Sequence, residues 1–195
     1  FTMKSLVALF AVAFALAVAL GLVSARAQTT APELRQVQVR ALTAPDGRSM
    51  EVTTGFVSVP EQRTGPDARA RRIELAVVRL RWVGATPGSA ANMVLAGGPG
   101  DSGTRLVSGL PERQAAALLD LMGGDVIAFD QRGTGRSQPN LALAEPTPLP
   151  LDAPGSPEAW LPLMERASRL AAERFAATGI RLTSYTTVEG ADDVD

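Results

Sequence analysis

The alternation of apolar and polar residues predicts three β-strands in the first half of the chain. Residues 34–40 and 51–60 alternate or carry many β-branched side chains, and residues 72–83 form a longer run of the same kind. A period of two residues is typical of strands. Pro45, Asp46 and Gly47 predict a turn between the first two strands. Pro60 ends the second strand, and residues 61–70 are expected to be a loop.

The second half of the chain has a different pattern, in which strands alternate with helices. Residues 92–96 and 125–130 are short and apolar, as in strands buried on both faces. Between them, residues 111–122 are rich in helix formers, with Pro111 at the first helical position and glycines at the end. This β-α-β order predicts a parallel pair with a right-handed crossover. Ligands gather at the C-terminal ends of such strands, where two glycine-rich loops begin.

A proline-rich connection and two further helices are predicted after residue 139. Ser156 is suited to cap a helix over 156–179, with Pro157 at its first position and Gly179 at its end. Thr187 is expected to cap a last helix that has Glu189 in its first turn. The longer helix carries one apolar stripe, made of Trp160, Leu163, Met164, Ala167, Leu170 and Ala171.

The N-terminal segment has the pattern of a secretory signal peptide. Lys4 precedes an uncharged apolar run over 6–23, and Ala25 and Ala27 form an A-x-A site. We expect residues 1–27 to be removed and residues 28–195 to form an extracytoplasmic domain, secreted or periplasmic. The alternative is an uncleaved membrane anchor. In either case this segment is the only expected contact with a membrane.

Composition restricts the chemistry available to the chain. Its 195 residues fit one domain, and its net charge of −1 argues against a nucleic-acid partner. It has no cysteine and no histidine. These absences exclude disulfides, thiolate or imidazole metal sites, and a Ser-His-Asp triad completed within these residues. No cofactor and no metal are expected, and the oligomeric state stays open.

The glycine-rich segment 93–103 admits three interpretations. Its G-x-G-x-x-G spacing over 98–103, with Asp130 as the acidic partner, matches a dinucleotide-binding loop, although Pro99 removes a backbone donor. Its "GDSG" matches the nucleophile motif of trypsin-like proteases, but Ser102 then lacks a histidine. A local structural role for the Ser102 hydroxyl is the alternative. Third, backbone N–H groups of the loop can bind an oxyanion, unless the glycines only form a tight turn.

The two glycine-rich loops together resemble the α/β-hydrolase superfamily. The match is to the proline iminopeptidase and tripeptidyl aminopeptidase branch of serine peptidases. "GFVSVPEQR" over 55–63 and "YTTVEGADDVD" over 185–195 resemble further family segments, so the resemblance covers roughly residues 55–195. Ala96 stands where many relatives have histidine. The loop residues that match are Gly97, Gly98, Pro99 and Gly100, followed by Asp130, Arg132, Gly133, Gly135, Ser137 and Pro139.

This resemblance implies the N-terminal part of an α/β-hydrolase fold, with early antiparallel strands and then a β-α-β parallel sheet with flanking helices, incomplete in this chain. It implies that the loop of Gly97, Gly98, Pro99 and Gly100 forms part of the oxyanion hole, with the N–H groups supplied by its glycines. The second loop would be structural, and Arg132 would hold it by charge-assisted hydrogen bonds. The nucleophile elbow G-x-S-x-G is absent from these residues. We therefore expect the triad beyond Asp195 and no catalytic residue, and no triad-dependent activity, in this chain.

The expected function is that of the N-terminal portion of an exported serine exopeptidase acting on peptides or on small esters and amides. Two other classes remain open at this point. A non-catalytic secreted α/β binding domain would show a cooperative thermal transition for residues 28–195, whereas a fragment would aggregate or stay molten. A dinucleotide-binding domain would bind its cofactor in calorimetry.

Overall fold

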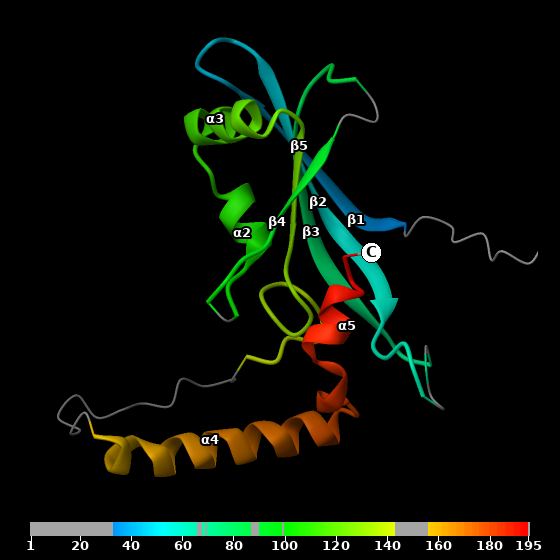
Figure 1. Ribbon diagram of the computed structural model, residues 1–195, viewed down its shortest axis with the longest axis vertical. Coiled ribbons are helices and arrows are strands. Elements are labelled where there is room, and N and C mark those ends of the chain that lie inside the picture. The colour runs from blue at the N-terminus through cyan, green and yellow to red at the C-terminus, as the bar shows by residue number, and fades with distance from the viewer. Residues whose placement is uncertain are drawn as a thin grey trace, which may run out of the picture. The chain divides into compact units, whose positions relative to one another are not determined.

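The computed structural model describes residues 33–65, 68, 70–86, 90–98, 100–142 and 156–194. All of them belong to one structural unit, Pro32–Asp195. The proposed signal segment 1–27 lies outside the described residues. The unit contains a mixed five-stranded sheet with the strand order β1-β2-β3-β5-β4, accompanied by helices (Figure 1).

The first three strands form an antiparallel meander, as the alternation predicts. They are β1 (Leu34–Thr43), β2 (Ser49–Pro60) and β3 (Arg72–Trp82). The β2–β3 ladder runs without interruption along both strands. The β1–β2 ladder shifts register between Arg35 and Gln38, where Gln36 has a φ of 50°. This bulge is a local feature that the alternation does not reveal.

The β-α-β unit is also present. Strands β4 (Ala91–Val94) and β5 (Asp125–Phe129) pair in parallel, and β5 also pairs with β3 in the antiparallel sense. The connection carries two helices, α2 (Gly103–Ser108) and α3 (Glu112–Met122). The sequence interpretation missed α2, which is short. It also placed Pro111 inside α3, whereas Pro111 is the N-cap residue.

Strand β4 contradicts the prediction of a strand buried on both faces. Ala91 and Met93 are exposed, whereas the residues of β5 are mostly buried. The reason is position, because β4 pairs only with β5 among the described strands and therefore lies at a sheet edge. An apolar run of this length cannot distinguish an edge strand from a central one.

Apolar side chains cover both faces of the sheet. Helices α2 and α3 pack on one face, over the larger cluster. Because side chains alternate along a strand, a smaller cluster of Val59, Ile73, Leu75 and Phe129 lies on the other face. The larger cluster contains Leu42, Ala44, Met50, Val52, Val78, Leu80, Val107, Ala115, Ala116, Leu119, Val126 and Ala128.

The C-terminal elements are α4 (Pro157–Ala177), the 3₁₀ turn η1 (Leu182–Ser184) and α5 (Thr187–Ala191). Ser156 is the N-cap of α4, as expected, but the N-cap of α5 is Thr186 rather than Thr187. The predicted apolar stripe does not face a core. Only Phe175 of α4 is buried, and Trp160, Met164 and Leu170 are exposed, because the described residues cover only the C-terminal end of this helix. Within the described ranges, no helix has the length and apolarity needed to cross a membrane.

Candidate functional site

Two loops meet at the C-terminal ends of the parallel strands. The loop after β4 contains the glycines at 97, 98 and 100, and the loop after β5 runs from Asp130 to Asn140 (Figure 1). The Gln131 Nε2 atom donates a hydrogen bond of 3.3 Å to the Ala96 carbonyl. The sequence prediction that these loops lie at one edge of the sheet is therefore correct.

The carboxylate of Asp130 joins the two loops. This side chain is fully buried. Its Oδ1 atom accepts hydrogen bonds from the Ser102 hydroxyl at 2.8 Å and the Thr104 N–H at 2.9 Å. Its Oδ2 atom accepts from the Thr104 hydroxyl at 2.9 Å and the Arg136 N–H at 2.7 Å. Four donors thus surround one carboxylate, which fixes the start of α2 against the second loop.

Ser102 has a structural role in this arrangement. Besides donating to Asp130, its hydroxyl oxygen accepts the Arg105 N–H at 3.1 Å and caps α2. This matches the alternative in which Ser102 satisfies local backbone groups. A Cβ atom at the next residue, Gly103, would lie 2.5 Å from the Phe129 carbonyl oxygen, so α2 begins in direct contact with β5.

The second loop is held in place by close contacts and buried hydrogen bonds. A Cβ atom at Gly135, whose φ is 53°, would overlap the Asp130 carboxylate, and Gly133 also has a positive φ of 81°. The buried hydroxyl of Ser137 donates to the Asp130 carbonyl at 2.6 Å and accepts the Ala76 N–H at 3.0 Å. Ser137 therefore ties the loop to β3.

Arg132 connects this loop to the C-terminal elements. Its side chain is 3% exposed. Nε and Nη2 bind the two carboxylate oxygens of Asp193 at 2.8 and 2.7 Å, a bidentate pair. Nη1 donates to the carbonyls of Glu61 at 2.8 Å and Ser184 at 2.7 Å. The expected charge-assisted hydrogen bonds are present, and their partners lie at the end of β2 and next to α5.

Arg63 holds the same end of α5 from a second side. Its N–H and its Nη1 atom each lie 2.9 Å from one carboxylate oxygen of Glu189, and Nη2 lies 2.7 Å from Asp193 Oδ1. Burial would raise the pKa of Glu189, but the hydrogen bonds from Arg63 outweigh it and lower that pKa. The segments 55–63 and 185–195 can each be recognised in the sequence, but local patterns cannot pair residues that are 126 positions apart.

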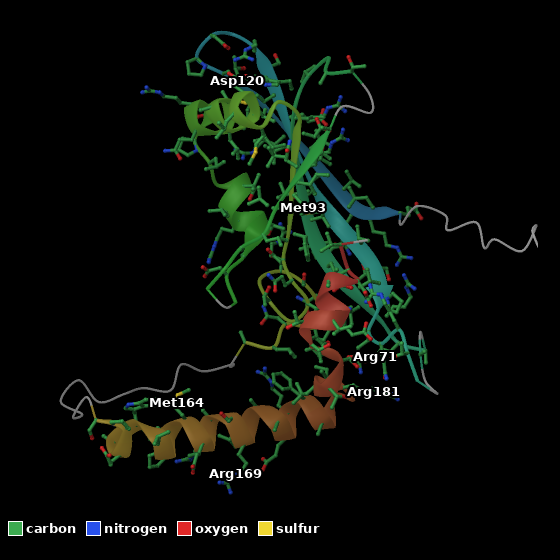
Figure 2. All side chains as sticks on the ribbon, in the orientation of Figure 1. Arg71, Met93, Asp120, Met164, Arg169 and Arg181 are labelled. Carbon is green, nitrogen blue, oxygen red and sulfur yellow. The ribbon has the colours of Figure 1, made fainter. Side chains whose placement is uncertain are left out.

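Glu61, whose backbone carbonyl accepts a hydrogen bond from Arg132, also has a buried carboxylate. Its Oε1 atom accepts hydrogen bonds from the Tyr185 hydroxyl at 3.2 Å and the Arg181 N–H at 3.4 Å, and Arg71 Nε lies 3.5 Å from Oε2. Burial and the charge of Glu61 raise the pKa of Tyr185. A cavity of about 140 Å³ adjoins this carboxylate, and Arg71 and Arg181 lie next to each other there (Figure 2).

The glycine loop itself presents unused backbone donors. Gly97, Gly98 and Gly100 are exposed, and none of their N–H groups donates a hydrogen bond to another described residue. Gly98 and Gly100 have φ angles of 119° and 101°. The loop is closed by the Asp101 N–H, which donates to the Gly97 carbonyl at 3.2 Å. Pro99, which the resemblance places in the oxyanion hole, lies outside the described residues.

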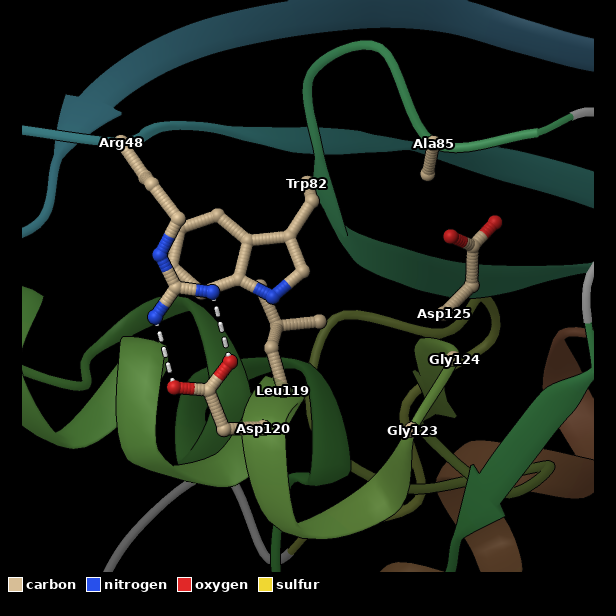
Figure 3. Close-up of a pocket in the computed structure, with 8 residues that line it drawn as sticks. All are labelled: Arg48, Trp82, Ala85, Leu119, Asp120, Gly123, Gly124 and Asp125. Atoms are coloured by element: carbon tan, nitrogen blue, oxygen red, sulfur yellow. Dashed lines mark hydrogen bonds and ion pairs between the residues drawn. The ribbon is translucent and has the colours of Figure 1, made fainter.

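A separate cavity of about 270 Å³ is lined by Asp125, where β5 begins, and so lies away from these loops (Figure 3). Arg48 lies across it, 3.9 Å from the centre of the Trp82 ring, and binds both carboxylate oxygens of Asp120 at 2.8 and 2.7 Å. Asp125 in turn binds Arg79. The charged side chains that line this cavity are therefore already paired, and we assign the cavity a structural role.

Among the described residues, no group of acidic side chains is placed to hold a metal ion. No model of a protein family matches the chain, and no curated protein matches it. The structure thus establishes a mixed open sheet of α/β type with two linked loops at the ends of parallel strands.

Proposed function

We propose that this chain is part of an exported serine hydrolase, of the exopeptidase kind, in which the loop 97–100 stabilises the oxyanion of the tetrahedral intermediate. The observation that carries the proposal is the set of unused N–H groups of Gly97, Gly98 and Gly100 at the end of a parallel strand. An oxyanion needs backbone donors that are already in place before the reaction.

The surrounding contacts supply this preorganisation. The Asp130 carboxylate binds the first residues of α2, only a few positions after the glycines. Gly103 is fixed against the backbone of β5. These contacts hold the C-terminal end of the glycine loop, so few rearrangements are needed when charge develops on a substrate oxygen.

The free edge of β4 offers a place for the nucleophile. Strand β4 pairs with β5 alone among the described strands, and Met93 on it is 43% exposed (Figure 2). A parallel strand added there would end beside the glycine loop. With a nucleophilic serine at that end, the N–H of the residue after the serine would be the second oxyanion donor. The resemblance implies that such a strand follows the segment 185–195.

The Asp130 network argues against the two enzyme-like alternatives. A dinucleotide-binding loop needs an acidic side chain to accept a ribose hydroxyl, but Asp130 is fully buried and already accepts four hydrogen bonds. A nucleophilic Ser102 of the trypsin-like kind needs a histidine base, and the sequence has none. Its hydroxyl instead binds the buried Asp130 and caps α2. The remaining alternative, a non-catalytic binding domain, predicts no turnover by either polypeptide in the experiment below.

The test is hydrolysis of aminoacyl and tripeptidyl p-nitroanilides. We expect no turnover by residues 28–195, and turnover by the polypeptide translated from the complete reading frame. In the latter, G100A keeps the N–H group but strains the backbone at a φ of 101°, which should displace the loop from its donor geometry. We expect kcat to fall by roughly 10²-fold, as it does when an oxyanion donor is lost. G123A, a glycine-to-alanine change at another positive φ, is the matched control. Turnover by residues 28–195, or none by the complete polypeptide, would overturn the proposal.

A further inference from the structure

The cleft between α2 and the second loop has a strongly one-sided charge. Its volume is about 340 Å³, at the lower end of the range for small-molecule sites. The residues that line it are Gly100, Ser102, Thr104, Arg105, Ser108, Gly135 and Arg136. Two of these are arginines and none is acidic. Gly100 places one wall of the cleft in the proposed oxyanion loop.

The two arginines are available to a ligand. Neither the Arg105 nor the Arg136 guanidinium has an ion pair or a hydrogen bond with another described residue; Arg136 lies over the Phe56 ring at 5.7 Å. The contrast with Arg132 is clear, because its guanidinium is buried and fully bonded. A third arginine, Arg40, donates to the Ser108 carbonyl at 2.8 Å and adds positive charge at the rim.

Neighbouring acids do not compensate these charges directly. The Asp130 carboxylate lies below the cleft, but it is fully buried and its oxygens are used by four donors. The side chain of Asp101 contacts the Gly98 position instead and does not line the cleft. An anion entering the cleft therefore meets two guanidinium groups without displacing an internal carboxylate.

We infer that this cleft binds a carboxylate group, and that Arg105 and Arg136 select peptide substrates with an acidic residue close to the scissile bond. The forked guanidinium matches a carboxylate in a bidentate manner. The identification of the carboxylate as part of a peptide substrate rests on the proposed function. Binding of the carboxylate itself does not, so the two can fail separately.

The binding experiment titrates the chain with N-acetylglutamate, and with N-acetylglutamine and inorganic phosphate as separate probes, followed by amide chemical shifts. We expect N-acetylglutamate to bind in the millimolar range and at least tenfold more tightly than the other two. R105Q/R136Q should weaken its binding at least tenfold, and R105K/R136K by less. R113Q, which removes an exposed arginine outside the cleft, should change binding less than twofold.

Equal affinity for N-acetylglutamate and N-acetylglutamine would overturn the inference, as would tighter binding of phosphate or an equal loss in R113Q. Circular dichroism of each variant shows that a loss of binding is not a loss of folding. In the complete polypeptide, R105Q/R136Q should reduce kcat/KM for acidic substrates at least tenfold but not for neutral ones. An equal reduction for both substrates would also overturn the inference, whereas absence of all turnover refutes the proposed function alone.

Discussion

Asp130 determines the geometry of both loops through one side chain. Each of its carboxylate oxygens accepts two hydrogen bonds in a site without solvent access. Through these hydrogen bonds the residue joins the loop after β4 and the loop after β5 into a single rigid unit. In the structure its role is to fix the two loops to each other, and under the proposed function it also positions the backbone donors of the loop 97–100.

Replacing Asp130 tests this role. In D130N an NH₂ group faces backbone and hydroxyl donors, so at least two hydrogen bonds are lost. We expect the free energy of unfolding to fall by roughly 3 kcal/mol, measured by urea denaturation of the polypeptide from the complete reading frame. D101N, at the exposed position directly after Gly100, should have almost no effect. Equal effects of the two substitutions would contradict the role of Asp130.

Glu189 gives the structure a defined dependence on pH. Burial raises the pKa of this carboxyl, but the hydrogen bonds from Arg63 lower it by more. In the folded state the pKa is therefore below its ordinary value of 4.5. A group with a lowered folded pKa stabilises the fold above its unfolded pKa and loses that contribution as the pH falls through the folded pKa. The stabilisation by Glu189 is therefore complete at neutral pH and is lost below about 4.5.

The comparison of E189Q with the unsubstituted protein measures this effect. The difference in stability between them should be largest above pH 5 and should shrink as the pH falls below about 4.5. Urea denaturation at a series of pH values provides the measurement, with E112Q on the exposed side of α3 as the control. A difference that grows on acidification would have the wrong sign for this account.

At the scale of elements, alternation in the sequence identified the meander, and two short apolar runs around a helix-forming segment identified the β-α-β order. These patterns failed to predict burial where burial depends on which other elements pack against a strand or helix. Met93 is exposed because no described strand covers β4, and Trp160 is exposed because most of α4 contacts little of the described chain. The short helix α2 was missed because six residues give no periodicity, although its cap Ser102 was visible.

In the candidate site, too, the sequence predicted the local loop residues but not their partners far along the chain. Motif spacing selected Asp130 and Arg132 correctly as loop residues. It could not reveal that Arg132 binds Asp193, or that Arg63 binds Glu189, because these partners are 61 and 126 positions apart. Pairs of that kind depend on the register of the sheet and on the path of α4, which local patterns do not contain.

The attachment of α5 is predicted to depend on Arg132. Replacement by alanine leaves the Asp193 carboxylate, which has no exposed surface, without one of its two arginine partners. R132A should cost about 3–5 kcal/mol and should increase amide hydrogen exchange first in α5. R132K keeps the charge but not the bidentate geometry, so its effect should be intermediate.

A matched control is available in Arg48, whose ion pair with Asp120 is about half exposed. R48A also removes an arginine that binds both oxygens of a carboxylate, from the opposite end of the sheet, and it should leave exchange in α5 unchanged. Equal protection of α5 in R132A and R48A would show that Arg132 does not attach this helix.

At the scale of the whole molecule, the free edge of β4 is the dominant feature. Met93 and Leu95 are 43% and 59% exposed, and the outer backbone groups of β4 pair with no other described strand. Such edges promote association between chains. We expect residues 28–195 to self-associate in sedimentation velocity as concentration rises, and M93K to reduce this association because a charged side chain on the edge disfavours pairing.

V83K provides the control, because Val83 is 59% exposed but lies after β3 rather than on β4. It should leave self-association unchanged. Equal effects of M93K and V83K would point to general hydrophobicity rather than to the β4 edge.

The most direct measurement of the central claim is covalent labelling by a fluorophosphonate, with the labelled serine located by peptide mass spectrometry. The claim predicts no adduct on residues 28–195. In the polypeptide from the complete reading frame, it predicts one adduct, at a serine beyond Asp195, formed roughly 10²-fold more slowly in G100A. An adduct at Ser102, or an adduct whose rate is the same in G100A, would contradict the assignment of the glycine loop as an oxyanion-binding element.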